Sequence, residues 1–155
     1  MIGGKGDKDH SLKLKQFSKE TYMPPFVGER FENFIHLAHG GTGNGESENS
    51  PLPIANQDLM ALEPGMVIES VKPVVQTAIA GATACLVGDD DDPDGFVADA
   101  DMTEATPGAY VGAGAYLAAG ANKYYPAAKT LKWAQTGDST DGKLCLVVSG
   151  YKLSS

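Results

Sequence analysis

The sequence predicts a mainly β protein, with an antiparallel β-sandwich or jelly-roll-like domain preceded by an extended N-terminal arm with one short helix. The 155 residues include 19 glycines and 9 prolines, which is typical of a turn-rich β protein. From residue 52 onward, short apolar runs alternate with turn signals. A polar, glycine-rich stretch separates these runs from a basic N-terminal segment. Three regions follow: an arm with a helix at 1–39, a linker at 40–51 and a sandwich at 52–155.

The arm begins with a basic segment. Residues 1–19 contain five Lys and two Asp, and they have too few large apolar side chains to fold alone. Residues 11–15 (SLKLK) alternate with period two, so they can add a strand to the sheet of another chain. A disordered tail is the alternative, but exposed Phe and Leu side chains favour an arm that binds a partner. The expected contacts are Leu12, Lys13, Leu14, Lys15, Phe17, Phe26, Phe31 and Phe34.

A short helix is predicted at 29–39. Its apolar residues recur at i, i+3, i+4 and i+7, and Gly40-Gly41 follows as a helix end would require. A helix this short needs a surface to dock on. Residues 40–51 are nearly all Gly, Ser, Asn, Thr and Glu, which indicates a flexible linker.

The region 52–155 is predicted to contain six to eight short strands. Leu144-Cys145-Leu146-Val147-Val148 is the clearest of them, and residues 137–142 before it form a turn signal. Such spacing is typical of an antiparallel sandwich or jelly roll. Residues 108–121 are rich in Gly and Ala, which predicts a loop or a narrow strand where another backbone comes close.

An acidic loop is the one concentrated chemical feature. Residues 89–104 hold eight acids and no base. Oxygen ligands there match the EF-hand calcium loop in outline, with Gly95 at the turn. A metal-free Asp-Pro-Asp-Gly turn explains most of the pattern as well, and no other cofactor is expected. The candidate calcium ligands are Asp90, Asp92, Asp94 and Asp101.

Charge and motifs exclude several function classes. The net charge is −8 with a single Arg, so nucleic-acid binding is disfavoured. No apolar run is long enough for a membrane span, and the N-terminus has no secretory apolar region. No nucleophile, Walker or zinc-protease motif is present, so no enzyme is predicted. Cys85 and Cys145 are expected as buried apolar residues, with a disulfide only if their strands are neighbours.

Part of the sequence resembles a known family. Residues 77–153 are similar to a β-sandwich domain of structural proteins in tailed bacteriophages, and residues 62–69 (LEPGMVIE) are similar to an opening strand common in phage head decoration proteins. The stretches that carry the resemblance are 77–83 (TAIAGAT), 87–89 (VGD), 92–94 (DPD) with Phe96, 114–116 (GAY), 129–131 (KTL) and 142–151 (GKLCLVVSGY).

The resemblance implies a non-enzymatic virion protein, a capsid decoration or cement protein that stabilises the head shell. Its expected partners are the major capsid protein and further copies of itself, as a dimer or trimer. Its expected place is the capsid surface, after assembly in the host cytoplasm. The alternatives are a head fibre, tail or adaptor protein of the virion, or a calcium-dependent module that binds a surface or a glycan.

Overall fold

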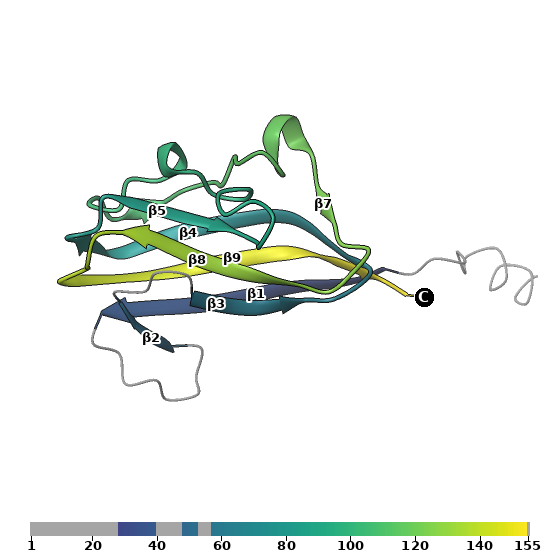
Figure 1. The fold of residues 1–155 in the computed structure, drawn as a ribbon, viewed down its shortest axis with the longest axis horizontal. Helices are drawn as coiled ribbons and strands as arrows, with labels where there is room; N and C mark the ends of the chain where they lie inside the picture. The colour runs from purple at the N-terminus through teal and green to yellow at the C-terminus, as the bar shows by residue number, and fades with distance from the viewer. Residues whose placement is uncertain (1–27, 40–47, 53–56, 155) are drawn as a thin grey trace, which may run out of the picture.

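The structure is a computed structural model, and it describes residues 28–39, 48–52 and 57–154 (Figure 1). It confirms a mainly β fold built from two sheets. The six-stranded sheet has the order β2-β1-β9-β4-β6, with β7 also paired to β4, and the three-stranded sheet has the order β3-β8-β5. The strands are β1 (Gly28–His39), β2 (Glu48–Leu52), β3 (Gln57–Leu62), β4 (Met66–Ala80), β5 (Ala84–Gly88), β6 (Gly108–Ala109), β7 (Lys123–Tyr124), β8 (Lys129–Thr136) and β9 (Asp141–Leu153).

All strand pairs are antiparallel except β1 with β2, which is parallel. Two 3-10 helices, η1 (Asp99–Asp101) and η2 (Ala118–Gly120), interrupt the long connection from β5 to β8. None of the helices in the described ranges is long and apolar enough to cross a membrane.

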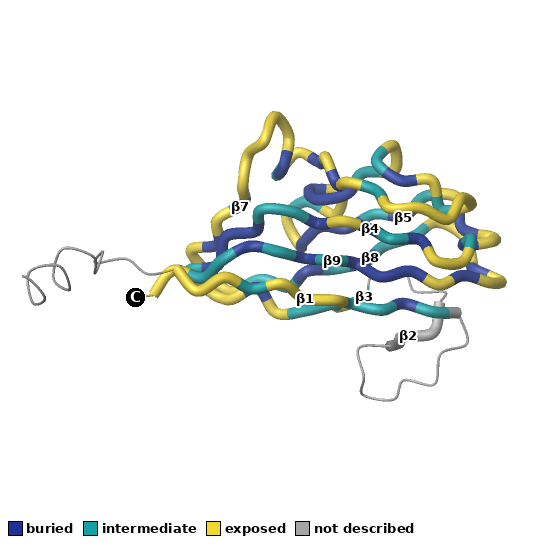
Figure 2. The backbone as a smooth tube through the Cα atoms, turned by 180° about the vertical axis from the view of Figure 1, so that it is seen from behind, coloured by how far each residue is buried: buried dark blue, intermediate teal, exposed yellow. Residues whose placement is uncertain are grey.

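One hydrophobic core draws residues from both sheets. Leu131 and Trp133 of β8 are fully buried, and so are Leu144, Leu146 and Val148 of β9. These residues are two apart in the chain because alternate side chains of a strand point to the same face. In Figure 2 the buried positions therefore recur along the central strands. The clearest predicted strand, at 144–148, is confirmed as part of β9.

The helix predicted at 29–39 is wrong, because these residues form strand β1. It pairs with β9 over eleven residue pairs, from Gly28 beside Leu153 to Ala38 beside Lys143, without a register shift. Leu37 is 1% exposed in the core, and Phe31 packs against the core. The apolar residues fit a helical stripe equally well. The hydrogen bonds to β9, more than a hundred residues away in sequence, select the strand, since a helix this short is marginal alone.

Strand β1 also bears on the predicted domain boundaries. It precedes the predicted linker at 40–51, yet it lies in the same sheet as β9, the last strand of the predicted domain at 52–155. Of the predicted linker, residues 48–51 are described, as part of β2, which ends at Leu52, the first residue of the predicted domain. Independent folding of residues 52–155 stays a prediction.

The glycine-rich segment at 108–121 comes close to other backbone segments, as predicted. The amide of Gly112 donates to the carbonyl of Val71 on β4 over 2.9 Å. An added Cβ at Gly112 would collide with the carbonyl oxygens of Phe96 and Val71, and one at Gly114 would collide with the Asp94 and Gly95 backbone. Both positions therefore need glycine, and this segment packs directly over the acidic loop.

Candidate functional site

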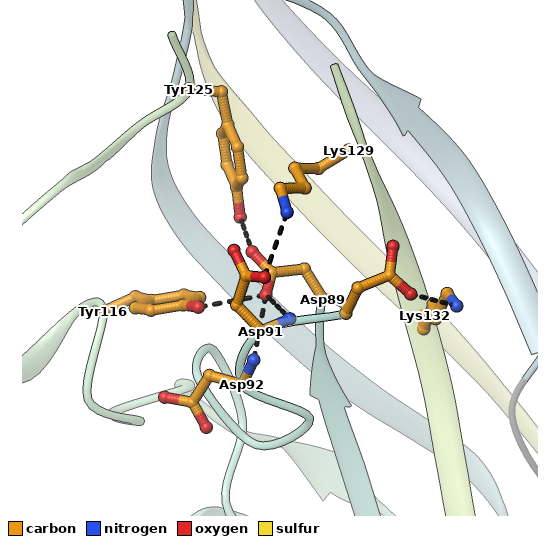
Figure 3. A network of polar contacts seen from close by, with 8 residues as sticks. Asp89, Asp91, Asp92, Tyr116, Tyr125, Lys129 and Lys132 are labelled. Atoms are coloured by element: carbon orange, nitrogen blue, oxygen red, sulfur yellow. Dashed lines mark hydrogen bonds and ion pairs between the residues drawn. The ribbon is translucent and has the colours of Figure 1, made fainter. Parts of the chain in front are cut away.

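The acidic loop is organised around one buried carboxylate, that of Asp89 (Figure 3). Asp89 directly follows β5 and is 2% exposed. Its Oδ1 accepts hydrogen bonds from the backbone N–H groups of Asp91 (2.9 Å) and Asp92 (3.0 Å) and from the Tyr116 hydroxyl (3.0 Å). Its Oδ2 accepts the Tyr125 hydroxyl at 2.7 Å. Four donors thus satisfy a charge that burial alone would make costly.

These hydrogen bonds set the ionisation of the three side chains. Burial by itself would raise the pKa of Asp89, but the bonds from Tyr125, the loop backbone and Tyr116 outweigh it and lower the pKa below the ordinary value. Burial, together with the hydrogen bond to the Asp89 carboxylate, raises the pKa of both tyrosines. Asp89 therefore stays ionised and both hydroxyls stay protonated near neutral pH, which is the state that this network requires.

Lysines surround the loop at its exposed side. Lys129 pairs with Asp91 at 3.0 Å, and Lys132 pairs with Asp90. The hydrogen bond to the partner carboxylate is the main cause that raises the pKa of each of these lysines. The Lys123 ammonium lies 3.8 Å from the ring centroid of Tyr116, within cation–π range. Two lysines of β8 thus pair with two acids of the loop, and a lysine of β7 lies over one of its tyrosines.

The four predicted calcium ligands make three different sets of contacts. Asp90 pairs with Lys132. The hydrogen bond with the Asp94 carboxyl is the largest cause that raises the pKa of Asp92. Oδ2 of Asp101 accepts the backbone N–H groups of Ala98 and Ala113, each at 2.8 Å, and so ties η1 to the glycine-rich segment.

In the described part of the chain, no group of three or more His, Cys, Asp or Glu side chains is arranged to hold a metal ion. Calcium binding by these residues stays a prediction.

Two shallow pockets flank the loop. The first, of about 180 Å³, is lined by Asp89, Asp90, Pro93, Lys132 and Ala134. The second, of about 210 Å³, is lined by Asp91, Lys123, Tyr124, Tyr125, Pro126, Ala127 and Lys129. Both are smaller than the roughly 300 Å³ at which small-molecule sites usually begin. The half-exposed ring of Tyr124 lines the second pocket together with Lys123 and Lys129.

The predicted arm contacts divide between described and undescribed residues. Phe31 and Phe34 lie on β1, where Phe31 packs against the core and Phe34 is 53% exposed. They therefore face opposite sides of the sheet. The other predicted contacts lie outside the described residues: Leu12, Lys13, Leu14, Lys15, Phe17 and Phe26.

The two cysteines are free and buried. Cys85 lies on β5 and Cys145 on β9, so they belong to different sheets. Burial, with added repulsion from Glu104 and Asp99, raises the pKa of the Cys85 thiol to about 12. Burial also raises the pKa of Cys145. Both side chains remain thiols at neutral pH and behave as small apolar residues, as the sequence predicts.

Sequence reasoning identified the acidic loop but missed the role of its first residue. The two tyrosines that bind the carboxylate of Asp89, Tyr116 and Tyr125, come 27 and 36 residues later in the chain. Tyr116 also packs against the core, with its ring centroid 5.1 Å from that of Phe96. Pairing across such separations leaves no periodic signal in the chain.

The fold is shared with chains of phage capsids, although no family model and no curated protein matches the sequence. One neighbour belongs to the cyanophage Pam1 capsid asymmetric unit. It aligns with a TM-score of 0.57 and 15% identity over 84% of this chain and 89% of the neighbour. Another belongs to the acid-stable capsid structure of Helicobacter pylori bacteriophage KHP30, with a TM-score of 0.57, 13% identity, and 85% and 97% coverage. The predicted resemblance to structural proteins of phage virions is confirmed in the fold.

Proposed function

We propose that this protein is a structural component of a phage virion, and specifically a decoration or cement protein of the head. The observation that carries the proposal is the shared fold with chains of two phage capsids. Each match covers most of both chains, so the neighbours are similar in length to this protein. The resemblance is therefore to a whole small capsid chain, rather than to one domain of a much larger protein.

The acidic loop supports such a role because it forms a rigid surface. The Asp89 network fixes the end of β5 to the segments that carry Tyr116 and Tyr125. Asp101 fixes η1 to the glycine-rich segment in the same way. A preformed surface loses little conformational entropy on binding, which favours attachment to a shell. Tyr124, 51% exposed beside Lys123 and Lys129, is the aromatic anchor that we expect to contact the major capsid protein.

The N-terminal arm is the second proposed contact. Its large apolar residues, among them Phe17 and Phe26, would be buried against the shell or a neighbouring subunit. Each such side chain contributes about 1.5–3 kcal/mol on burial, and ordering the backbone costs roughly 1–2 kcal/mol per residue. Arm and sandwich together give multivalent attachment, in which modest individual contacts add up through effective concentration.

Quantitative analysis of purified phage particles tests this proposal. A decoration protein should be present in copy numbers comparable with that of the shell protein, and it should crosslink to that protein through residues near Tyr124 or the arm. Particles stripped of it should lose their contents at a lower temperature, and added protein should restore the original value. A low copy number would indicate a head fibre, tail or adaptor protein. Absence from particles would overturn the virion role.

A further inference from the structure

Among the described residues, strand β1 has an unpaired half-edge at residues 28–35. On one side it pairs with β9 along almost its whole length. On the other side β2 pairs only with the segment His36–His39. No strand in the described part of the chain pairs with residues 28–35 on that side. Exposure follows the same division, because residues 28–30 and 32–34 are exposed whereas Leu37, opposite β2, is buried (Figure 2).

This half-edge lacks most of the features that prevent strands from pairing. Residues 28–35 contain no proline and no lysine, and their register with β9 is unbroken. The one irregularity of the strand, a register shift against β2, lies between His36 and Leu37, where the edge is already covered. A regular edge of this length presents unpaired N–H and C=O groups to any extended segment.

Acids and aromatic rings stand beside this edge on both faces of the sheet. The odd-numbered residues face the core side and include Glu29 and Phe31, and the even-numbered residues face outward and include Glu32 and Phe34. Arg30 is paired with Glu69 at 2.8 Å. Neither Glu29 nor Glu32 has an ion-pair partner among the described residues, so each face offers one uncompensated carboxylate.

We propose that residues 28–35 of β1 accept residues 11–15 of a second copy of this chain as an added strand. The segment SLKLK alternates leucine with lysine. Whichever face its leucines take, they meet a phenylalanine ring of β1, and its lysines meet a glutamate on the opposite face. The backbone pairing supplies the hydrogen bonds that apolar burial alone does not provide.

The geometry of the chain favours a second copy over the same one. Residues 16–27 join the donor segment to the start of β1, and twelve residues reach up to about 40 Å when extended. The sequence favours an extended connection, since Pro24 and Pro25 oppose the reversal that a hairpin would need. Gly28, the first described residue, pairs with Leu153 at the end of β9 (Figure 1). Each copy would then donate one arm and accept another, a head-to-tail contact that forms a closed ring where the rotation between copies closes.

Charge reversal in the full-length protein tests the pairing, with mass in solution as the readout. The wild type should be oligomeric. The arm variant Lys13→Glu/Lys15→Glu and the edge variant Glu29→Lys/Glu32→Lys should each shift toward monomer. Combining all four substitutions in one chain should restore the oligomer, and so should mixing the two variants, since each then meets an edge of opposite charge. The control variant Asp99→Lys/Asp138→Lys, which reverses two exposed acids outside β1, should keep the wild-type mass.

Three results of this experiment would contradict strand pairing between two copies of the chain. A monomeric wild type, or an edge variant with wild-type mass, would overturn pairing between copies. Loss of the oligomer in both variants without recovery in the variant that carries all four substitutions would also overturn it, because the arm and the edge would then not be partners. The measurement uses the isolated protein, so a negative result would leave the proposed capsid role intact.

Discussion

The Tyr125 hydroxyl donates to Oδ2 of Asp89 over 2.7 Å, and both residues are 2% exposed. This bond joins the residue that follows β5 to the residue that follows β7, at the edge of the other sheet. The amide of Tyr125 in turn donates to the carbonyl of Met66 at the start of β4. The hydrogen bond therefore links the two sheets through the long connection between β5 and β8.

Replacement of this carboxylate should weaken the whole domain. Asp89→Asn keeps the size of the side chain but loses the charge. Its NH₂ group, a donor, would face a hydroxyl or N–H that in the wild type donates to a carboxylate oxygen. Hydrogen bonds to a charged group are worth about 1.5–3 kcal/mol each, so we expect a loss of roughly 3 kcal/mol in the free energy of unfolding. Denaturant titration measures it. Asp99→Asn, at an exposed acid, should change stability by less than about 0.5 kcal/mol.

The same carboxylate should make stability depend on pH in the acid range. The pKa of Asp89 in the folded protein is below its ordinary value of about 3.9. The stabilisation is therefore complete above about pH 5, well above the unfolded-state pKa, and it is lost as pH falls through the lower, folded-state pKa. Unfolding free energies measured against pH should show a difference between wild type and Asp89→Asn that is constant above pH 5 and shrinks in stronger acid. A difference that is independent of pH would show that the charge of Asp89 is not what stabilises the network.

The acidic loop should tolerate removal of its exposed charges. The carboxyl of Asp94 raises the pKa of Asp92, through the hydrogen bond between them and because two neighbouring negative charges repel each other. The variant Asp92→Asn/Asp94→Asn removes both charges and with them this repulsion. We expect the melting temperature without calcium to stay level or rise slightly, and added calcium to leave it unchanged. A calcium-dependent gain in the melting temperature of the wild type, abolished in this variant, would instead establish the calcium site predicted from the sequence.

Local patterns predicted this fold where the deciding forces are local. The alternation around Leu144 and Leu146 identified β9, and the glycines at 108–121 identified a close approach of backbones, since both are properties of short segments. The spacing of Phe31, Phe34, Ile35 and Ala38 fits either a helix or one exposed and one buried face of a strand. The choice depends on β9, at the far end of the chain, and no local pattern encodes it.

The same reason explains what was missed at the site. An acid directly after a buried apolar strand is compatible with an exposed turn, and the turn residues around Asp92 support that reading. What makes Asp89 a structural residue is the arrival of two tyrosines from distant segments. Their hydroxyls are satisfied only in the folded chain, so the sequence shows two aromatic residues without indicating their partner.

Strand β1 provides the last prediction, which concerns the boundary of the folded domain. Leu37 is 1% exposed and belongs to the common core, although it precedes the predicted linker. Truncation of a buried leucine to alanine costs about 2–5 kcal/mol, because apolar burial is lost and a cavity remains. Leu37→Ala should therefore lower the unfolding free energy of the full-length protein by that amount. The matched change on the same strand, Phe34→Ala at a 53% exposed position, should cost much less.

If Leu37→Ala is as stable as the wild type, β1 contributes little to the fold, and residues 52–155 alone should then show the same cooperative unfolding transition as the full-length protein. If the loss is found, the folded domain begins at β1, and a chain starting at residue 52 should unfold at a lower temperature and expose the edge of β9.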